Sequence, residues 1–169
     1  MADRLLIRRA TPEDAPALSA LAFRSKAHWG YSSEFMDACR GELTIGAQQL
    51  ETRELHAFKA LEGDELLGFY ALEVLSSEAC ELDALFVAPE HMGRGVGRAL
   101  LEHARVQAVS FSASVLVIQG DPHAAAFYEA AGARHVDDRA SGSIAGRYLP
   151  LYELDTNSAH GVGNNKNAK

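Results

Sequence analysis

A glycine-rich turn between an apolar strand and an apolar helix constrains this chain more than any other segment. The strand Leu82–Val87 leads into a turn with Gly93, Gly95 and Gly97, and a helix with an apolar face follows at once. The first N–H groups of a helix have no partner within it and lie at the positive end of the helix dipole. Glycines let a ligand approach those groups, so the segment predicts a phosphate or pyrophosphate site.

Two common nucleotide-binding motifs do not fit this turn. A dinucleotide-binding turn needs the spacing G-x-G-x-x-G, and here the third glycine is displaced. A P-loop ends in Gly-Lys-Ser/Thr, which this turn lacks. Arg94 and Arg98 flank the turn and would add positive charge toward the same anion.

The turn resembles the pyrophosphate loop of the GNAT superfamily, the acyl-CoA-dependent N-acetyltransferases, whose pattern is Gln/Arg-x-x-Gly-x-Gly/Ala. The diagnostic glycines match, whereas Met92 replaces the usual Gln or Arg. The resemblance implies that the loop holds the pyrophosphate of acetyl-CoA, largely through backbone N–H groups. The residues so implied are Met92, Gly93, Arg94, Gly95, Val96, Gly97 and Arg98.

A second segment, residues 121–133, resembles the family's motif Asn/Asp-Pro-x-Ala-x-x-Phe-Tyr-x-x-x-Gly-Phe. Asp121 is predicted to cap a short helix, and Gly132 is predicted to end it. A strand at 115–119 lies between the two motifs, and the resemblance covers roughly residues 66–154. It implies cofactor contacts from Asp121, Ala124, Phe127 and Tyr128.

Composition is that of an ordinary globular protein. The 169 residues, 47% hydrophobic and 23% charged, suit a single domain, which we place at residues 1–155, followed by a disordered polar tail at 156–169. The net charge of −7 argues against nucleic acid or an anionic membrane as the main partner. Two cysteines, with no signal peptide and no transmembrane run, predict a cytoplasmic protein with reduced thiols.

Hydrophobic periodicity predicts strands alternating with helices. Helices are expected at 12–26, 33–40 and 48–52, directly after the glycine turn that ends at Gly97, and from 122, and strands at 5–9, 55–61, 66–75, 80–87, 115–119, 134–138 and 147–154. Gly63 and Asp64 predict a tight hairpin turn between two of these strands. The resemblance implies an α/β, GNAT-like fold, with a central mixed, mostly antiparallel, twisted sheet of about seven strands and helices on both faces.

Acetyl transfer to an amine needs a base, a stabilised oxyanion and a proton for the departing thiolate. The family motif commonly has a tyrosine beside the CoA sulfur, which implies that Tyr128 is the acid; a core tyrosine is the alternative. Glu81 stands at the offset of the family's base glutamate, and Asp83 is a rival on the same strand face. Two neighbouring carboxylates raise each other's pKa, although solvent-facing charges are the other interpretation.

The resemblance also implies an oxyanion site of backbone N–H groups at Leu85, Phe86 and Val87, where two central parallel strands separate. The loop containing His28, Trp29 and Tyr31 is rich in aromatic residues. It either walls the acceptor site or anchors the first two helices to the sheet.

Arg147 ends a loop of small residues. It either meets a substrate carboxylate or lies on a surface turn. None of the histidines stands at an evident metal-ligand spacing, so no metal site is predicted.

Three functions remain open. The first is an N-acetyltransferase that moves the acetyl group of acetyl-CoA to a small amine or amino-acid-like molecule. Direct attack in a ternary complex is expected, because no cysteine stands in a motif suited to an acetyl-enzyme. The second is a protein lysine or N-terminal acetyltransferase, and the third is a non-catalytic acetyl-CoA sensor. A homodimer is implied only by analogy with relatives.

Overall fold

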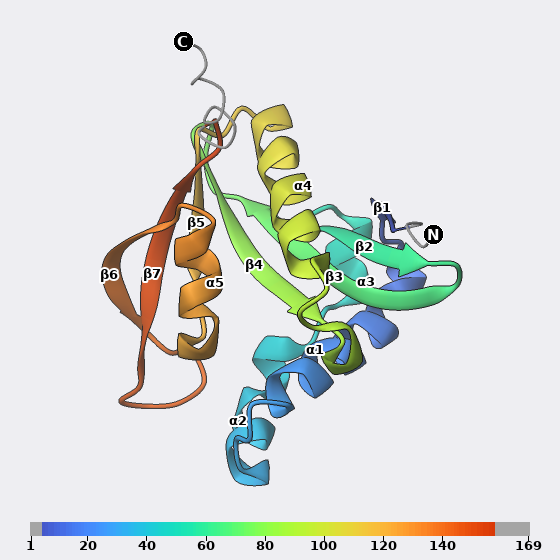
Figure 1. Ribbon diagram of the computed structural model, residues 1–169, viewed down its shortest axis with the longest axis vertical. Coiled ribbons are helices and arrows are strands. Elements are labelled where there is room, and N and C mark those ends of the chain that lie inside the picture. The colour runs from blue at the N-terminus through green and yellow to red at the C-terminus, as the bar shows by residue number, and fades with distance from the viewer. Residues whose placement is uncertain (1–4, 158–169) are drawn as a thin grey trace.

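The computed structural model describes residues 5–157, which form one twisted sheet with helices on both faces (Figure 1). The strands are β1 (Leu6–Arg9), β2 (His56–Glu62), β3 (Glu65–Val74), β4 (Ala79–Val87), β5 (Val115–Gln119), β6 (Arg134–Ala140) and β7 (Tyr148–Asp155). The helices are α1 (Ala15–Ala27), α2 (Ser33–Leu43), α3 (Ala47–Glu51), α4 (Val96–Ser110) and α5 (Ala125–Ala130). Short 3-10 turns are η1 (Pro12–Asp14), η2 (Pro89–His91) and η3 (Pro122–Ala124).

The sheet is mixed and mostly antiparallel, as predicted. Its seven strands lie in the order β1-β2-β3-β4-β5-β7-β6, and only the β4–β5 pair is parallel. The predicted hairpin between β2 and β3 is confirmed, because Glu62 pairs with Glu65 across the two-residue turn. Gly63 adopts a φ of 62° in that turn, a conformation that glycine reaches without steric cost.

Two hydrophobic cores lie on opposite faces of the sheet. One, the α4 core, packs α4 and α5 against one face and includes Tyr70, Leu100 and Leu116. The other, the α1 core, packs α1–α3 against the opposite face and includes Leu18 and Phe69. Neighbouring residues of β3 enter different cores, as the two-residue period of a strand requires.

A β-bulge interrupts this alternation in β4. Ala71 of β3 pairs with Ala84 and Leu72 pairs with Leu82, so Asp83 is an extra residue without an opposite partner. Leu82 therefore packs in the α4 core while Ala84 packs in the α1 core, two positions along the same strand. Bulges of this kind redirect side chains and occur often beside active sites.

The C-terminal end of the described chain is anchored to the sheet. Thr156, at the start of the predicted tail, is buried, and its hydroxyl donates to the carbonyl of Ala113 at 3.0 Å. The rest of that prediction, residues 158–169, lies outside the described residues. Across residues 5–157, no helix has the length and apolar character needed to cross a bilayer.

Gly68 brings β3, β4 and α4 into close contact. A Cβ at this position would lie 2.7 Å from the Phe86 carbonyl oxygen and 3.1 Å from Leu100. We expect Gly68→Ala to lower the free energy of unfolding by about 1–3 kcal/mol, since the backbone of β4 must shift. Chemical denaturation measures this change.

Gly41 of α2 is the matched control for that substitution. A Cβ there meets nothing within 4 Å. Gly41→Ala should raise the free energy of unfolding by about 0.5–1 kcal/mol, because alanine loses less backbone entropy in a helix. Equal effects of the two substitutions would contradict the close contact at Gly68.

Candidate functional site

The parallel strands β4 and β5 separate along their length. Their pairing runs from Ala79 opposite Val115 to Leu82 opposite Ile118 and then stops, whereas β4 remains paired with β3 as far as Val87. Figure 1 shows the two strands diverging below α4. Residues 83–87 of β4 thus have no strand partner on their β5 side.

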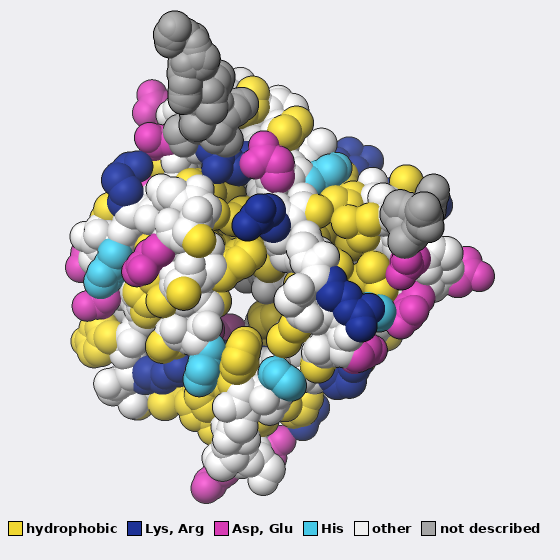
Figure 2. Space-filling model, viewed as in Figure 1, with side chains coloured by type: hydrophobic (Ala, Val, Ile, Leu, Met, Phe, Trp, Pro, Cys, Tyr) yellow, Lys and Arg dark blue, Asp and Glu magenta, His cyan; other side chains and the backbone are white. Residues whose placement is uncertain are grey.

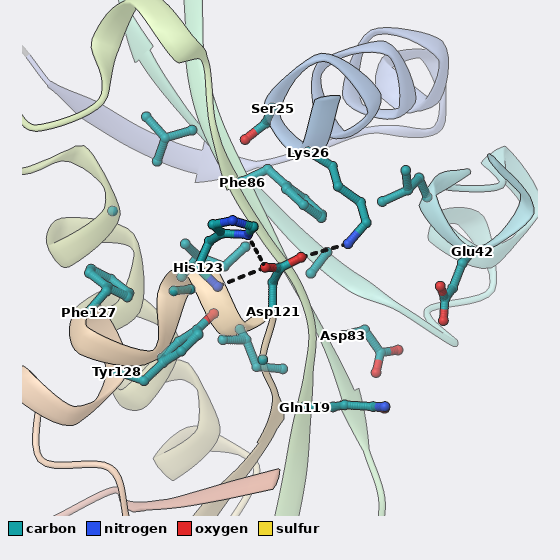
Figure 3. Close-up of a pocket in the computed structure, with 18 of the residues that line it drawn as sticks. Ser25, Lys26, Glu42, Asp83, Phe86, Gln119, Asp121, His123, Phe127 and Tyr128 are labelled. Carbon is teal, nitrogen blue, oxygen red and sulfur yellow. Dashed lines mark hydrogen bonds and ion pairs between the residues drawn. The ribbon is translucent and has the colours of Figure 1, made fainter. Parts of the chain in front are cut away.

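A cavity of about 900 Å³ lies at this separation. Figure 2 shows an opening between α4 and α5, and Figure 3 shows the side chains that line the cavity. The predicted residues that line it are Trp29, Glu81, Asp83, Leu85, Phe86, Val87, Met92, Gly93, Gly95, Gly97, Arg98, Asp121, Ala124, Phe127 and Tyr128. The structure therefore brings both sequence motifs and both carboxylate candidates to one space.

The glycine turn is built to accept an anion. Gly93 and Gly95 have φ values of 80° and 87°, in the left-handed region, and Gly95 is the N-cap of α4. The first helical bond runs from the Ala99 N–H to the Gly95 carbonyl at 3.0 Å, which leaves earlier N–H groups free of helical partners. A Cβ at either glycine would meet no protein atom within 4 Å, so the space is open to a ligand.

Two residues of the predicted pyrophosphate loop stand apart from the cavity. The side chain of Val96 is buried in the α4 core and does not line the cavity. Val96 is the first residue of α4, so only its backbone lies at the glycine turn. The exposed Arg94 is absent from the cavity lining. Arg98, one turn into α4, does line the cavity and is the better placed of the two arginines.

The two carboxylate candidates have different surroundings. Glu81 is ion-paired with Arg139 of β6, whose Nη1 lies 2.9 Å from Glu81 Oε2 and donates to Gln119 Oε1 at 3.2 Å. Asp83, the bulge residue, forms no ion pair with a described residue and opens onto the cavity beside Glu73. Oxygen atoms of Glu73, Glu81 and Asp83 lie within 4.8 Å of one another.

These surroundings raise the pKa of Asp83 to about 7. Although Asp83 is exposed at the open cavity, desolvation of its carboxyl by the surrounding protein is the largest cause; the charges of Glu73 and Glu81 add to it, whereas Arg139 acts in the opposite direction. A carboxyl with a pKa near neutrality gives and takes protons readily at physiological pH. Asp83 is thus the stronger of the two base candidates.

Tyr128 lies in α5 with its ring buried and its hydroxyl directed toward the cavity (Figure 3). Gly120 makes room for it, since a Cβ there would lie 3.2 Å from the ring. Burial raises the pKa of the Tyr128 hydroxyl, and the charge of Asp121 raises it further. The hydroxyl is therefore protonated at neutral pH and available as a proton donor. Phe127 also lines the cavity and packs against the α4 core.

Asp121 directs its carboxylate toward the end of α1. It accepts hydrogen bonds from Lys26 Nζ at 2.9 Å and from the Tyr31 hydroxyl at 2.8 Å, and it caps η3 through the His123 N–H. Although burial acts to raise it, the hydrogen bonds from Lys26 and the His123 N–H hold the pKa of Asp121 well below its usual range.

The residues predicted for the acceptor site divide into two groups. Trp29 lines the cavity, and the residue is 42% exposed. His28 packs edge-on against Trp29 and is absent from the lining. Tyr31 and Arg147 are half-buried and bonded to each other at 3.0 Å, which places Arg147 in a structural contact.

Sequence reasoning missed several lining residues. Lys26 and Glu42 come from α1 and α2, where a charged residue carries no sign that distinguishes it from a solvent-facing one. Gln119, the last residue of β5, also reaches the cavity. His123 belongs to the second motif, but a histidine on a short helix is more often a solvent-exposed residue than part of a site.

Comparisons with known proteins agree with this geometry. Residues 53–132 match the family model described as an acetyltransferase (GNAT) domain. No curated protein sequence matches the chain.

Three solved structures illustrate the likeness. An acetyltransferase from Thermus thermophilus is 27% identical, with a TM-score of 0.65 over 91% of this chain and 98% of that one. The PaiA N-acetyltransferase from Thermoplasma acidophilum in complex with coenzyme A is 19% identical, with a TM-score of 0.71 over 89% and 98%. A GNAT family acetyltransferase from Elizabethkingia anophelis with acetyl-CoA bound is 20% identical, with a TM-score of 0.66 over 90% and 99%.

The family model covers the β2–α5 segment, which contains both motifs and the β4–β5 separation. The open glycine cradle, the unpaired end of β4 and the cavity between them fit the acyl donor of this family. The chain therefore carries a GNAT acetyltransferase domain, matched over residues 53–132, and its fold is that of solved acetyltransferases.

Proposed function

We propose that this protein transfers the acetyl group of acetyl-CoA to the primary amine of a small molecule by direct attack in a ternary complex. The observation that carries the proposal is the meeting of Asp83, Tyr128 and the unpaired end of β4 in one cavity. These groups correspond to the base, the acid and the oxyanion site that the reaction needs.

The proposed reaction assigns one task to each group. Acetyl-CoA supplies the acetyl group as a thioester. Asp83 takes the proton that the amine must lose before its nitrogen bonds to the acetyl carbon. Backbone N–H groups of β4 at Leu85, Phe86 and Val87 stabilise the negative charge that develops on the carbonyl oxygen. Tyr128 donates a proton to the sulfur as the carbon–sulfur bond breaks.

The enclosure of the cavity supports a small acceptor. The loop between β6 and β7 is linked to α2, because Ser143 Oγ donates to Glu42 Oε1 at 2.5 Å. The same loop is tied to the α1–α2 loop by the bond between Arg147 and Tyr31. Glu42 lines the cavity, so these links hold the β6–β7 loop beside it and leave less room for a polypeptide acceptor than for a small molecule.

The charges of the lining support a cationic acceptor. Lys26 of the lining pairs with Asp121, and Arg139 nearby pairs with Glu81, whereas Asp83 and Glu42 form no ion pair within the described part of the chain. Arg147 bonds Tyr31 and lies 3.9 Å from Asp121, which argues against its use as a carboxylate receptor. An amine without a carboxylate therefore suits the site better than an amino acid.

Release of free CoA thiol from acetyl-CoA across a panel of amines, polyamines, aminoglycosides, amino acids and lysine peptides tests the proposal. Turnover of a small amine is the expected result, with none in the absence of an acceptor. Turnover of lysine peptides alone would favour a protein acetyltransferase, and acetyl-CoA binding without any turnover would favour a sensor. Either result overturns the proposal.

Asp83→Asn should lower kcat/KM by about 10²–10⁴-fold, because the amide accepts no proton.

In the unmodified enzyme, kcat/KM should rise as the pH passes through about 7, since the base works only when ionised. Glu73→Gln removes a charge that raises this pKa, so its inflection should move to lower pH. The acceptor's own titration is common to all variants and cancels in the comparison. An unmoved inflection in Glu73→Gln would exclude Asp83 as the titrating group.

Tyr128→Phe should reduce kcat by about 10²-fold while the affinity for acetyl-CoA stays nearly unchanged, as expected for the loss of a general acid. Steady-state kinetics and calorimetric binding measure the two quantities. Tyr148→Phe, at a hydroxyl-bearing residue that is 65% exposed, is the matched control. Normal turnover in the Tyr128 variant would remove this residue from the mechanism.

Gly95→Ala should weaken acetyl-CoA binding by about tenfold or more, because a methyl group enters the cradle at the start of α4. Gly63→Ala is the control: Gly63 also has positive φ and no atom within 4 Å, but it lies in the β2–β3 turn. Backbone strain is common to both variants, but only Gly95 lies in the cradle. Calorimetry should therefore show a loss of acetyl-CoA affinity in Gly95→Ala alone. Equal affinities would contradict the pyrophosphate assignment.

A further inference from the structure

Asp121 lies where three segments of the acceptor side meet the segment that leads to α5. Its carboxylate bonds Lys26 at the end of α1, Tyr31 in the α1–α2 loop and the backbone of His123 in η3. Arg147 of the β6–β7 loop lies 3.9 Å away. These five residues are called the Asp121 cluster below; Figure 3 shows Lys26, Asp121 and His123 of this group.

Tyr31, like Asp121, contacts several members of the cluster. Its hydroxyl donates to Asp121, accepts from Arg147 Nη2 at 3.0 Å and lies 3.2 Å from His123 Nδ1. Its ring stacks on Phe35 of α2, with centroids 4.2 Å apart and planes 9° apart. The hydroxyl thus connects two loops and η3, while the ring holds Tyr31 against α2.

The cluster extends to the cavity through His123. Its Nδ1 lies 2.9 Å from Asp121 Oδ1, which fixes the imidazole plane. The Trp29 ring stacks on that plane, with centroids 4.9 Å apart and planes 5° apart. Both rings line the cavity. The position of the exposed Trp29 ring therefore depends on contacts made by Asp121.

The partners of Asp121 separate it from the cofactor. The family resemblance implies a cofactor contact here, yet the described partners of the carboxylate are cations and donors on the acceptor side. An ionised carboxylate also repels the anionic pyrophosphate of acetyl-CoA. The hydrogen bonds of the Asp121 carboxylate are thus made with residues on the acceptor side of the cavity and not with the cofactor side.

We propose that Asp121 and Tyr31 are positioning residues for the acceptor amine, which act by holding the Trp29–His123 stack in the wall of the cavity. This inference rests on the proposed acetyl transfer to a small amine. It assigns acceptor selection to contacts between α1, the α1–α2 loop, η3 and the β6–β7 loop.

Tyr31→Phe and Asp121→Asn test the inference. Tyr31→Phe removes the branching hydroxyl but keeps the stack on Phe35. Asp121→Asn removes the charge opposite Lys26 but keeps an oxygen that caps η3. Tyr148→Phe and Asp37→Asn are the matched controls, since both control side chains are exposed and neither lines the cavity. Melting temperatures establish that each variant folds.

Two readouts are measured on each variant. The first is kinetic: KM for the best amine of the panel should rise by about tenfold or more, while the Kd for acetyl-CoA changes by less than about twofold. The second is fluorescence of Trp29, the single tryptophan of the chain, whose quenching by acrylamide should increase. Both controls should behave as the unmodified enzyme.

A rise in the Kd for acetyl-CoA with an unchanged acceptor KM would overturn the inference and return Asp121 to the cofactor site. Unchanged kinetics and quenching in folded Tyr31→Phe would overturn it as well. If no amine is turned over by the unmodified enzyme, the proposed function fails by itself. Trp29 quenching then decides the positioning role, since unchanged quenching in both variants refutes it. Should Asp121→Asn not fold, Tyr31→Phe decides, because it leaves the cap of η3 intact.

Discussion

The early end of pairing between β4 and β5 is the constraint on which the rest of the structure depends. Backbone N–H groups without a partner are unfavourable when they are withdrawn from water, so a gap inside a sheet is retained only where a ligand or solvent enters it. Here the gap begins after Leu82 and Ile118, and the cavity occupies it. Gly68 keeps the unpaired end of β4 on β3 by allowing close backbone approach.

The bulge at Asp83 gives this gap its chemistry. In a regular strand, Glu81 and Asp83 are equivalent by alternation, and the sequence offers no ground to separate them. The extra residue frees Asp83 from a cross-strand partner, while Glu81 meets Arg139. Of the two carboxylates, Glu81 thus serves in an ion pair and Asp83 at the open cavity.

Features that depend on local backbone requirements were predictable from sequence. The hairpin at Gly63, the glycine cradle before α4 and the cap of η3 by Asp121 all follow from the conformational needs of a few neighbouring residues. The order of helices and strands followed from periodicity in the same way, and the two motifs identified the family.

Features that join distant segments were not predictable. Glu81 and Arg139 are 58 positions apart, and Tyr31 and Arg147 are 116 positions apart. Local sequence patterns contain no signal for such pairs, since each charge reads equally well as a solvated surface group. The partners of Asp121 therefore became visible only in the folded chain.

The placement of two cores on opposite faces of the sheet bears on how this protein can change. The α4 core supports the glycine cradle, whereas the α1 core supports the helices that wall the cavity, so each can accumulate substitutions with little effect on the other. Acceptor preference is therefore free to diverge while the donor site stays constant. Asp121 limits that divergence. Its carboxylate is paired with Lys26 and Tyr31, so any replacement of the α1–α2 segment must supply other partners for this charge.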